Sequence, residues 1–280
     1  SGTRTDWNTR MDIVLVGPGR AGTSLTIAFT GAGHRLVGVL ARDPARAEAA
    51  AARFGCPTLT WDADLPAADL VMIAVRDDAI AEVVTRLAGR AKAVGAAVHL
   101  SGLKPIDVLR PLGDLPVGSL HPLQTLPNPE AGAARLAGAW VAITTADDLL
   151  ADRLFTLAAS IGAHPFEVAD DAKAVYHAGA AAASNFPLAT LAMARRLFEA
   201  AGVPFEAAAP LIRAIVENAI AMGPEAALTG PVARGDVGTV RAQLAAVRAA
   251  VPDLAEDFVA MVMATARVAG TVEQIGPAVR

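Results

Sequence analysis

Four polar side chains with the potential for chemistry lie in a stretch otherwise built from small residues. The stretch reads KAVYHAGAAAASNF over residues 173–186, and the four are Lys173, His177, Ser184 and Asn185. On a helix, His177 lies about 40° and Ser184 about 20° round from Lys173. Asn185 lies on the flank. Such a face could stabilise negative charge growing on a substrate oxygen and supply a proton, from either the lysine or the histidine.

The spacing also limits what these side chains can do together. Lys173 and Ser184 are roughly 16 Å apart along a helix and cannot touch, so they would line a shallow groove for a small molecule. The alternative is structural: the lysine reaches solvent from a helix start, while His177 and Asn185 satisfy backbone groups between helices. A ligand-binding site elsewhere in the chain would favour the catalytic interpretation.

A glycine-rich turn near the N-terminus predicts such a site. GPGRAG follows an apolar run directly and has GxGxxG spacing. Gly17 allows the tight turn, Gly19 lets a pyrophosphate approach the backbone, and Gly22 lets the next helix pack on the strand. The phosphates would lie at the helix N-terminus, where N–H groups favour an anion. The predicted cofactor-binding turn comprises Gly17, Pro18, Gly19, Arg20, Ala21 and Gly22.

The end of the second apolar run favours NADP over NAD. An acidic residue there binds the ribose hydroxyls of NAD, whereas an arginine accommodates the additional phosphate of NADP. The chain has Arg42 at this place and Arg46 one helical turn later. Asp43 complicates this assignment, but Asp43 followed by Pro44 is typical of a helix N-cap. The alternative for both arginines is an exposed surface pair.

Further candidates follow the next strands, because ligands of open parallel sheets bind at the carboxyl ends of the strands. Val75 ends one run, while Ser101 and Gly102 offer a hydroxyl and an unhindered backbone near the expected nicotinamide. His121 could donate to a substrate oxygen or equally be a structural strand-end histidine. For His99, inside an apolar run, the structural role is preferred.

A last candidate lies in the turn-rich stretch 227–244. Arg234 could hold a substrate carboxylate with two hydrogen bonds. The alternative is a loop followed by a helix that Asp236 caps.

The order of apolar runs predicts an α/β fold: an N-terminal Rossmann-type parallel sheet and an all-α C-terminal domain. We expect residues 1–10 to be a disordered extension or expression remnant, 11–168 an NADP-binding domain, and 169–280 a helical substrate and dimerisation domain. The expected strands are 11–16, 35–40, 69–75, 96–100, 117–121, 139–145 and 164–168.

Composition excludes several classes of function. The 24 basic and 28 acidic side chains give no positive field for nucleic acid. A single cysteine, Cys56, allows no internal disulfide or cysteine metal site, so we expect no metal and a reducing cytoplasm. Mean hydropathy is high at +0.42, and residues 174–194 lack charge. Their alanine, histidine and proline nevertheless indicate a buried helix rather than a membrane span.

Six segments in this order resemble a bacterial family of Rossmann-like proteins with a helical C-terminal domain of unknown function. The segments are GPGRAG, ADLVMIAVRDDAI, HLSG, SLHPLQT, KAVYHAGAAAASNF and ALTGPVARGD. That family belongs to the 6-phosphogluconate dehydrogenase-like superfamily and includes alternative-type ketopantoate reductases, which use NADPH. The resemblance implies a homodimer through the C-terminal helices.

The resemblance also bears on individual residues. Superfamily members often have a catalytic lysine at the start of the second domain, which Lys173 matches, followed four residues later by asparagine. Here position 177 is histidine, and the nearest asparagine is Asn185. SLHP is similar to the His-Pro segment of prephenate dehydrogenases, whose histidine contacts substrate; this supports His121. Arg76 stands where such strands commonly continue with proline.

These observations predict an NADPH-dependent reductase of a small 2-oxo acid, with ketopantoate the first candidate. In this hypothesis Lys173 or His177 supplies the proton, Ser184 and Asn185 orient the substrate, and Arg234 holds its carboxylate. One alternative is another reductase of the superfamily, acting on a pyrroline-5-carboxylate-like imine or a different oxo acid. The other is a non-catalytic NADP-binding sensor or structural dimer.

Overall fold

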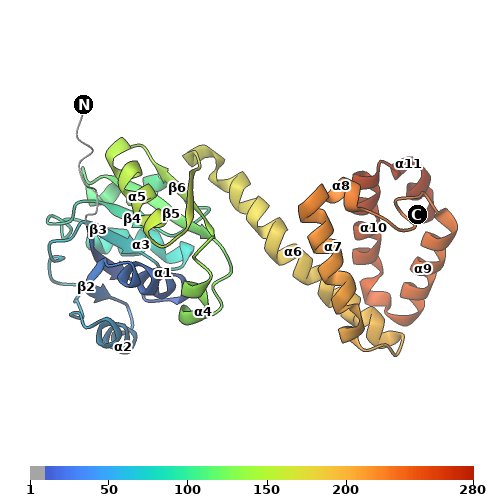
Figure 1. Ribbon diagram of the computed structural model, residues 1–280, viewed down its shortest axis with the longest axis horizontal. Helices are drawn as coiled ribbons and strands as arrows, with labels where there is room; N and C mark the ends of the chain where they lie inside the picture. The colour runs from blue at the N-terminus through green and yellow to red at the C-terminus, as the bar shows by residue number, and fades with distance from the viewer. Residues whose placement is uncertain (1–9) are drawn as a thin grey trace. The chain divides into compact units, whose positions relative to one another are not determined.

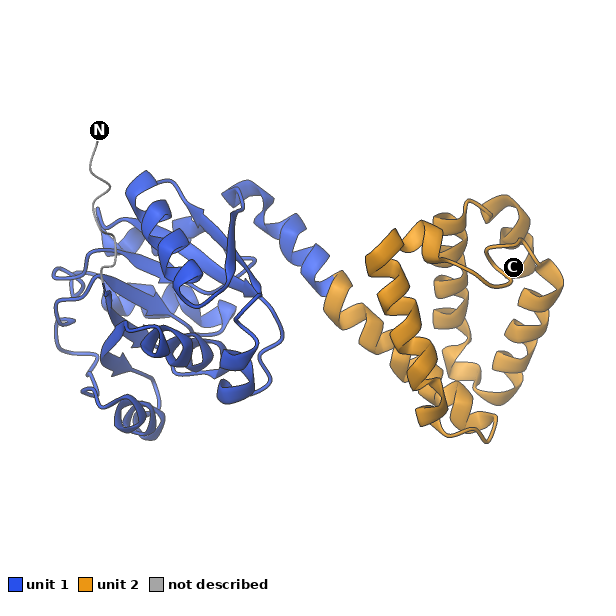
Figure 2. Cartoon of the chain, viewed as in Figure 1, with its two compact units in different colours: residues 1–181 blue, residues 182–280 orange. Residues whose placement is uncertain are grey.

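The computed structural model describes residues 10–280, which divide into two compact units. Unit 1 comprises residues 1–181 and unit 2 residues 182–280 (Figure 2). Apart from Arg10, the predicted N-terminal extension lies outside the described residues. No helix within residues 10–280 is long and apolar enough to cross a membrane.

Residues 10–181 form a seven-stranded sheet in the order β2-β1-β3-β4-β5-β6-β7 (Figure 1). All seven predicted strands are confirmed. They could be predicted because continuous β-branched runs are typical of strands buried on both faces. The strands are β1 (Asp12–Val16), β2 (Arg35–Leu40), β3 (Leu70–Ile73), β4 (Ala97–His99), β5 (Val117–Leu123), β6 (Trp140–Thr145) and β7 (His164–Glu167).

One pairing departs from the predicted parallel sheet. β5 and β6 are antiparallel, whereas the other neighbours run parallel. The connection between β5 and β6 carries only the six-residue helix α4 (Pro129–Ala134). A parallel crossover usually needs a longer helix that spans the sheet, so this short connection returns the chain antiparallel.

Helices cover both faces of the sheet. α1 (Arg20–Gly31), α2 (Pro44–Phe54) and α5 (Asp148–Ser160) pack on one face, in a core that includes Leu25, Phe29 and Leu154. α3 (Ile80–Leu87) and the 3-10 segment η2 (Ile106–Leu112) pack on the other. The carboxyl ends of the parallel strands thus meet at one edge, with α1, α2 and α3 beginning near it.

The remainder of the chain is helical, as predicted. Within the described chain no strand follows β7. The stretch 173–186 is helical as expected and lies in a helix from Lys173 to Ala200, and Asp236 caps α9 by accepting a hydrogen bond from Thr239 N at 3.0 Å. The helices are α6 (Lys173–Ala200), α7 (Ala209–Met222), α8 (Pro224–Ala227), α9 (Val237–Ala250), α10 (Ala255–Ala269) and α11 (Val272–Ile275).

The division between the units falls inside α6 rather than at residues 168–170. The start of α6 is attached to the sheet: Ile106 N donates to Asp170 Oδ1 at 2.9 Å, and Lys173 Nζ donates to Ser119 Oγ at 2.7 Å. These long-range bonds join the first turns of the helix to unit 1.

Candidate functional site

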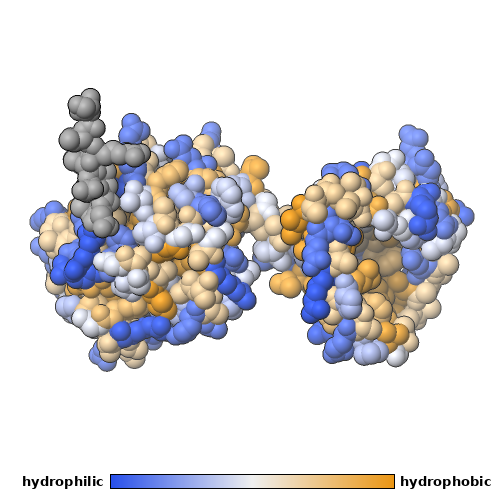
Figure 3. Space-filling model, in the orientation of Figure 1, coloured by the Kyte–Doolittle hydropathy of each residue, from blue (hydrophilic) through white to orange (hydrophobic). Residues whose placement is uncertain are grey.

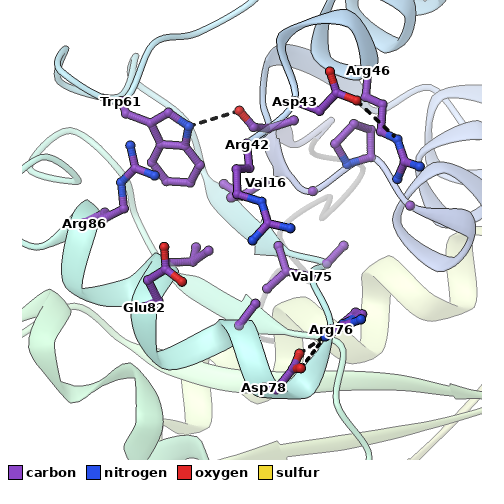
Figure 4. Close-up of a pocket in the computed structure, with 17 residues that line it drawn as sticks. Val16, Arg42, Asp43, Arg46, Trp61, Val75, Arg76, Asp78, Glu82 and Arg86 are labelled. Carbon is purple, nitrogen blue, oxygen red and sulfur yellow. Dashed lines mark hydrogen bonds and ion pairs between the residues drawn. The ribbon is translucent and has the colours of Figure 1, made fainter.

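A cavity of about 590 Å³ opens at the carboxyl ends of β1, β2 and β3 (Figure 4). This volume lies within the range of small-molecule and cofactor sites. The lining combines glycine backbone with charged side chains. It includes Gly17, Pro18, Gly19, Arg42, Asp43, Arg46, Trp61, Val75, Arg76, Asp78, Glu82 and Arg86.

The glycine turn has the geometry that a phosphate-binding backbone requires. Gly17 has φ +88°, and a Cβ on it would lie 2.6 Å from Val75 Cγ1. A Cβ on Gly22 would lie 2.5 Å from Ala74 Cβ, so only glycine lets α1 approach the sheet this closely. At Gly19 the nearest such atom is 3.8 Å away, which leaves the cavity side open.

The N-terminus of α1 points its unpaired N–H groups toward this turn. Among the described residues, no side chain caps the helix, whose N-cap is Gly19. Uncapped N–H groups and the helix dipole favour an anion at this place. The turn and the helix start therefore fit the pyrophosphate of a dinucleotide.

The two arginines predicted to select NADP both line the cavity. Asp43 acts as the predicted N-cap of α2, accepting from Ala45 N at 3.0 Å, and lies 3.6 Å from Arg46 Nε. Its carboxylate is therefore engaged with the helix start and with Arg46. Unlike Arg46, which lies near the capping carboxylate of Asp43, Arg42 extends its guanidinium into the cavity (Figure 4).

Trp61 and Arg86 form another part of the cavity wall. Trp61 Nε1 donates to Ala41 O at 3.0 Å, and Arg86 Cζ lies 4.0 Å from the centroid of the indole ring. This stacked pair fixes the loop after α2 against the end of β2. It presents a flat, positively charged surface to the cavity.

A second group of polar side chains lies where β4 and β5 end and α6 begins. Lys173 is only 2% exposed, and its Nζ donates to Ser101 O at 3.1 Å and to Ser119 Oγ at 2.7 Å. Burial lowers the pKa of this lysine to about 8, despite the opposing charges of Asp170 and Asp77. The lysine thus joins two strand ends from inside the protein.

His121 and Tyr176 form a hydrogen-bonded pair beside this lysine. Tyr176 Oη lies 2.7 Å from His121 Nδ1. Burial, followed by the charges of His177 and Lys173, lowers the pKa of His121 to about 4, and burial raises that of Tyr176 to about 12. At neutral pH both groups are therefore uncharged, and the tyrosine hydroxyl can donate to Nδ1 of the tautomer whose Nε2 carries the ring proton.

The position of the His121 ring explains why residue 102 is glycine. A Cβ at Gly102 would lie 2.8–2.9 Å from the His121 ring. The ring of His177 lies 6.1 Å from that of His121, centroid to centroid. The structure thus brings together Lys173, His177 and His121 from the predicted site.

Ser101 and His99 have mainly structural contacts. The Ser101 hydroxyl donates to Asp77 Oδ2 at 2.8 Å and accepts from the backbone N of Leu103 and Lys104. His99 is fully buried and accepts from Ser101 N through Nδ1, whereas its Nε2 has no hydrogen-bond partner among the described residues, so the expected structural role is met at one ring nitrogen only. Burial lowers the pKa of His99 to about 4, so its imidazole is neutral.

The remaining predicted residues belong to unit 2. Ser184 and Asn185 are exposed neighbours on α6, with Ser184 Oγ donating to Asn185 Oδ1 at 3.2 Å. Arg234 lies in the turn before α9. Their contribution to a site in unit 1 stays a prediction.

Sequence reasoning missed Tyr176 and Asp77. Tyr176 is the only tyrosine of the chain and lies between the two side chains singled out in its helix. Its rarity and position were a usable signal. Asp77 follows β3 directly, and its role depends on a contact with Ser101, 24 residues away, which local pattern does not encode.

Two family models match the chain. One is a Rossmann-like domain over residues 3–123, and the other is a domain of unknown function, DUF2520, over residues 139–265. The chain combines a Rossmann-like domain with a DUF2520 domain. This confirms the resemblance expected from the six segments. None of the curated proteins matches the chain.

Solved structures share the fold of both parts. A protein of Bacteroides fragilis, BF3122, assigned as an NADP oxidoreductase, has a TM-score of 0.77 at 23% identity, covering 92% of this chain and 98% of its own. An imine reductase of Myxococcus stipitatus in complex with NADP+ gives 0.67 at 14%, covering 95% of each chain. A 1-pyrroline-5-carboxylate reductase of Streptococcus pyogenes gives 0.61 at 16%, covering 93% and 98%. At these identities the likeness establishes the fold.

Proposed function

We propose that the protein is an NADPH-dependent reductase of a C=O or C=N bond in a small molecule. The observation that carries the proposal is the cavity in which an open glycine turn and two arginines after β2 line one space. The BF3122 protein and the imine reductase, both associated with NADP by name, support the same cofactor.

Different residues of the cavity bind different parts of the cofactor. The uncapped N–H groups at the start of α1 hold the pyrophosphate, and the Gly17–Gly19 turn lets it approach the backbone closely. Arg42 and Arg46 hold the additional phosphate on the adenosine ribose. When bound, the reduced nicotinamide supplies a hydride to the substrate carbon.

His121 is the proposed donor to the substrate heteroatom. In the tautomer in which Tyr176 donates to Nδ1, the N–H at Nε2 can donate a hydrogen bond to an oxygen or nitrogen that gains negative charge. His177, whose ring lies close to that of His121, is the alternative donor.

Lys173 acts in this proposal by positioning. Its ammonium holds the Ser101 backbone carbonyl and the Ser119 hydroxyl, so β4 and β5 present Gly102 and His121 at a fixed distance. Fixing such groups matters, because a displacement of about 1 Å can lower a rate about 10²-fold.

The substrate is the finer part of the proposal. Ketopantoate remains the first candidate, on the resemblance to alternative-type ketopantoate reductases. The imine and pyrroline-5-carboxylate reductases with the same fold favour a cyclic imine as the second candidate. With one cysteine, Cys56, the proposed location is the reducing cytoplasm.

The experiment is NADPH oxidation followed at 340 nm across ketopantoate, related 2-oxo acids, cyclic imines and pyrroline-5-carboxylate. Turnover with one class, with NADPH preferred to NADH, is the expected result. Tight NADPH binding without oxidation by any of these compounds would instead indicate the sensor or structural dimer.

A further inference from the structure

A fourth arginine, Arg76, lines the cavity at the place where β3 ends. Arg76 precedes the 3-10 turn η1 (Asp77–Ala79), and its backbone adjoins the glycine turn. A Cβ on Gly17 would lie 2.6 Å from Val75 Cγ1 and 3.0 Å from Ala74 O. The Gly17 backbone therefore packs on the two residues that precede Arg76, which puts this guanidinium within side-chain reach of the expected pyrophosphate.

Arg76 is engaged by a carboxylate two residues further along the chain. Its Nε lies 3.1 Å from Asp78 Oδ1, and its Nη2 bonds Asp78 Oδ2. Figure 4 shows the pair at the rim of the cavity. This two-bond geometry is the one by which arginine binds a phosphate group, so a phosphate can take the place of the carboxylate.

A phosphate can readily replace the Asp78 carboxylate on Arg76, because both side chains of the ion pair are open to solvent. Arg76 is 84% and Asp78 65% exposed. Exposed ion pairs contribute little to stability, so a dinucleotide phosphate can displace Asp78 at small cost.

Asp78 also interacts with a second cavity arginine. The hydrogen bond from Arg76 is the main reason that the pKa of Asp78 lies below its usual value, and the charges of Arg76 and Arg42 lower it further. The carboxylate is thus ionised at neutral pH, beside arginines that the cofactor also needs.

We propose that Asp78 is a built-in competitor for Arg76: the dinucleotide pyrophosphate displaces the Asp78 carboxylate and takes over the Arg76 guanidinium. The inference rests on the proposed dinucleotide site but assigns a role to two residues outside the glycine fingerprint. Arg76 would strengthen binding of any dinucleotide, with or without the additional phosphate, and Asp78 would weaken it.

The test compares dissociation constants, measured by calorimetry, for NADPH, NADH and ADP-ribose. All three contain the pyrophosphate, whereas only NADPH has the additional phosphate and ADP-ribose lacks the nicotinamide. We expect Arg76→Ala to weaken all three by roughly tenfold, as the loss of a charge-assisted hydrogen bond does. Asp78→Asn should tighten all three by about two- to fivefold, because the competing ion pair is removed.

A matched pair elsewhere provides the control. Arg110 Nη2 lies 3.0 Å from Asp107 Oδ2, with similar exposures of 76% and 58%, and neither residue lines the cavity. Arg110→Ala and Asp107→Asn should leave the three constants unchanged. Melting temperatures of all four variants report whether the fold is retained.

The outcomes separate this inference from the proposed function. If the wild type binds the ligands and neither Arg76→Ala nor Asp78→Asn changes the dissociation constants, the inference alone is overturned. Weaker binding by Asp78→Asn overturns the competitor role, and an Arg76→Ala effect on NADPH only overturns the pyrophosphate assignment. A wild-type protein that binds none of the three ligands contradicts the proposed function and the inference together.

Discussion

Unit 1 encloses most of its large apolar side chains, whereas unit 2 leaves many of them exposed. Phe29, Leu70 and Met72 are at most 1% exposed in the sheet core. On α7, by contrast, Leu211 is 68% and Ile220 82% exposed, and none of the described residues of that helix is buried. Figure 3 shows hydrophobic surface on unit 2. Unit 1 therefore has its core within one chain, while unit 2 has apolar surface left to cover.

The difference indicates that unit 2 has a second role. Exposed apolar surfaces of this kind commonly mark interaction sites. We propose that a second copy of the chain covers the apolar surface of α7, because symmetric homodimers are the commonest soluble oligomers. The resemblance to the superfamily supports the same assembly.

The largest effect is expected in unit 1, at Lys173. Lys173→Met removes the donor to Ser101 O and Ser119 Oγ, so turnover should fall about 10²-fold or more through misplacement of the strand ends. NADPH binding should change little, because Lys173 does not line the cavity. Steady-state kinetics and calorimetry measure the two quantities. Unchanged turnover in Lys173→Met would contradict the positioning role and show that the lysine serves the fold alone.

The next effect tests unit 2. Ile220→Glu alters a side chain that is exposed within one chain, so it should leave the fold intact and shift a dimer to monomer by burying a charge in the interface. Analytical ultracentrifugation measures the shift. Leu149→Glu in α5 is the matched control, since Leu149 is 55% exposed in unit 1. A monomeric wild-type protein would contradict the proposed dimer.

A smaller effect is expected at Tyr176. Tyr176→Phe removes the hydrogen bond to His121 Nδ1 and leaves the tautomer of His121 unspecified. We expect kcat to fall about tenfold, corresponding to about 1.4 kcal/mol for one hydrogen bond. The measurement is kcat as a function of pH. An unchanged kcat would show that His121 needs no partner.

The last effect concerns the stability of unit 1 in alkali rather than its activity. The pKa of Lys173 is about 8 in the folded chain and 10.5 unfolded, so above pH 8 the unfolded state binds the additional proton. Its destabilising contribution is full below pH 8 and is relieved as pH rises, by about 2–3 kcal/mol between pH 8 and 10. Urea unfolding of wild type and Lys173→Met should show this rise in the wild type alone. If the free energy of unfolding depends on pH equally in both proteins, the ammonium of Lys173 is exposed to solvent rather than buried.

Sequence patterns predicted the strands and the cofactor turn because both are local. Continuous β-branched runs identify buried strands, and the spacing of Gly17, Gly19 and Gly22 has a direct geometric meaning. The direction of β6 was not predictable in this way, since an apolar run reads the same in either direction. It depends on the short connection through α4.

The polar group was predicted only in part because its contacts are long-range. Helical geometry placed Lys173 and His177 on one face, but burial of the lysine depends on Ser119, 54 residues away. The partner of Tyr176 is likewise 55 residues away. Pattern identifies which residues can do chemistry, whereas tertiary packing decides which of them face a ligand.

The central claim, an NADPH site in the unit 1 cavity, is tested most directly at Arg42. The measurement is the dissociation constant of NADPH and of NADH for wild type and Arg42→Ala. The account predicts tighter NADPH binding by the wild type, and a loss of roughly 10- to 100-fold for NADPH in the variant with NADH almost unchanged. An equal effect on both nucleotides, or a wild type that prefers NADH, would contradict it.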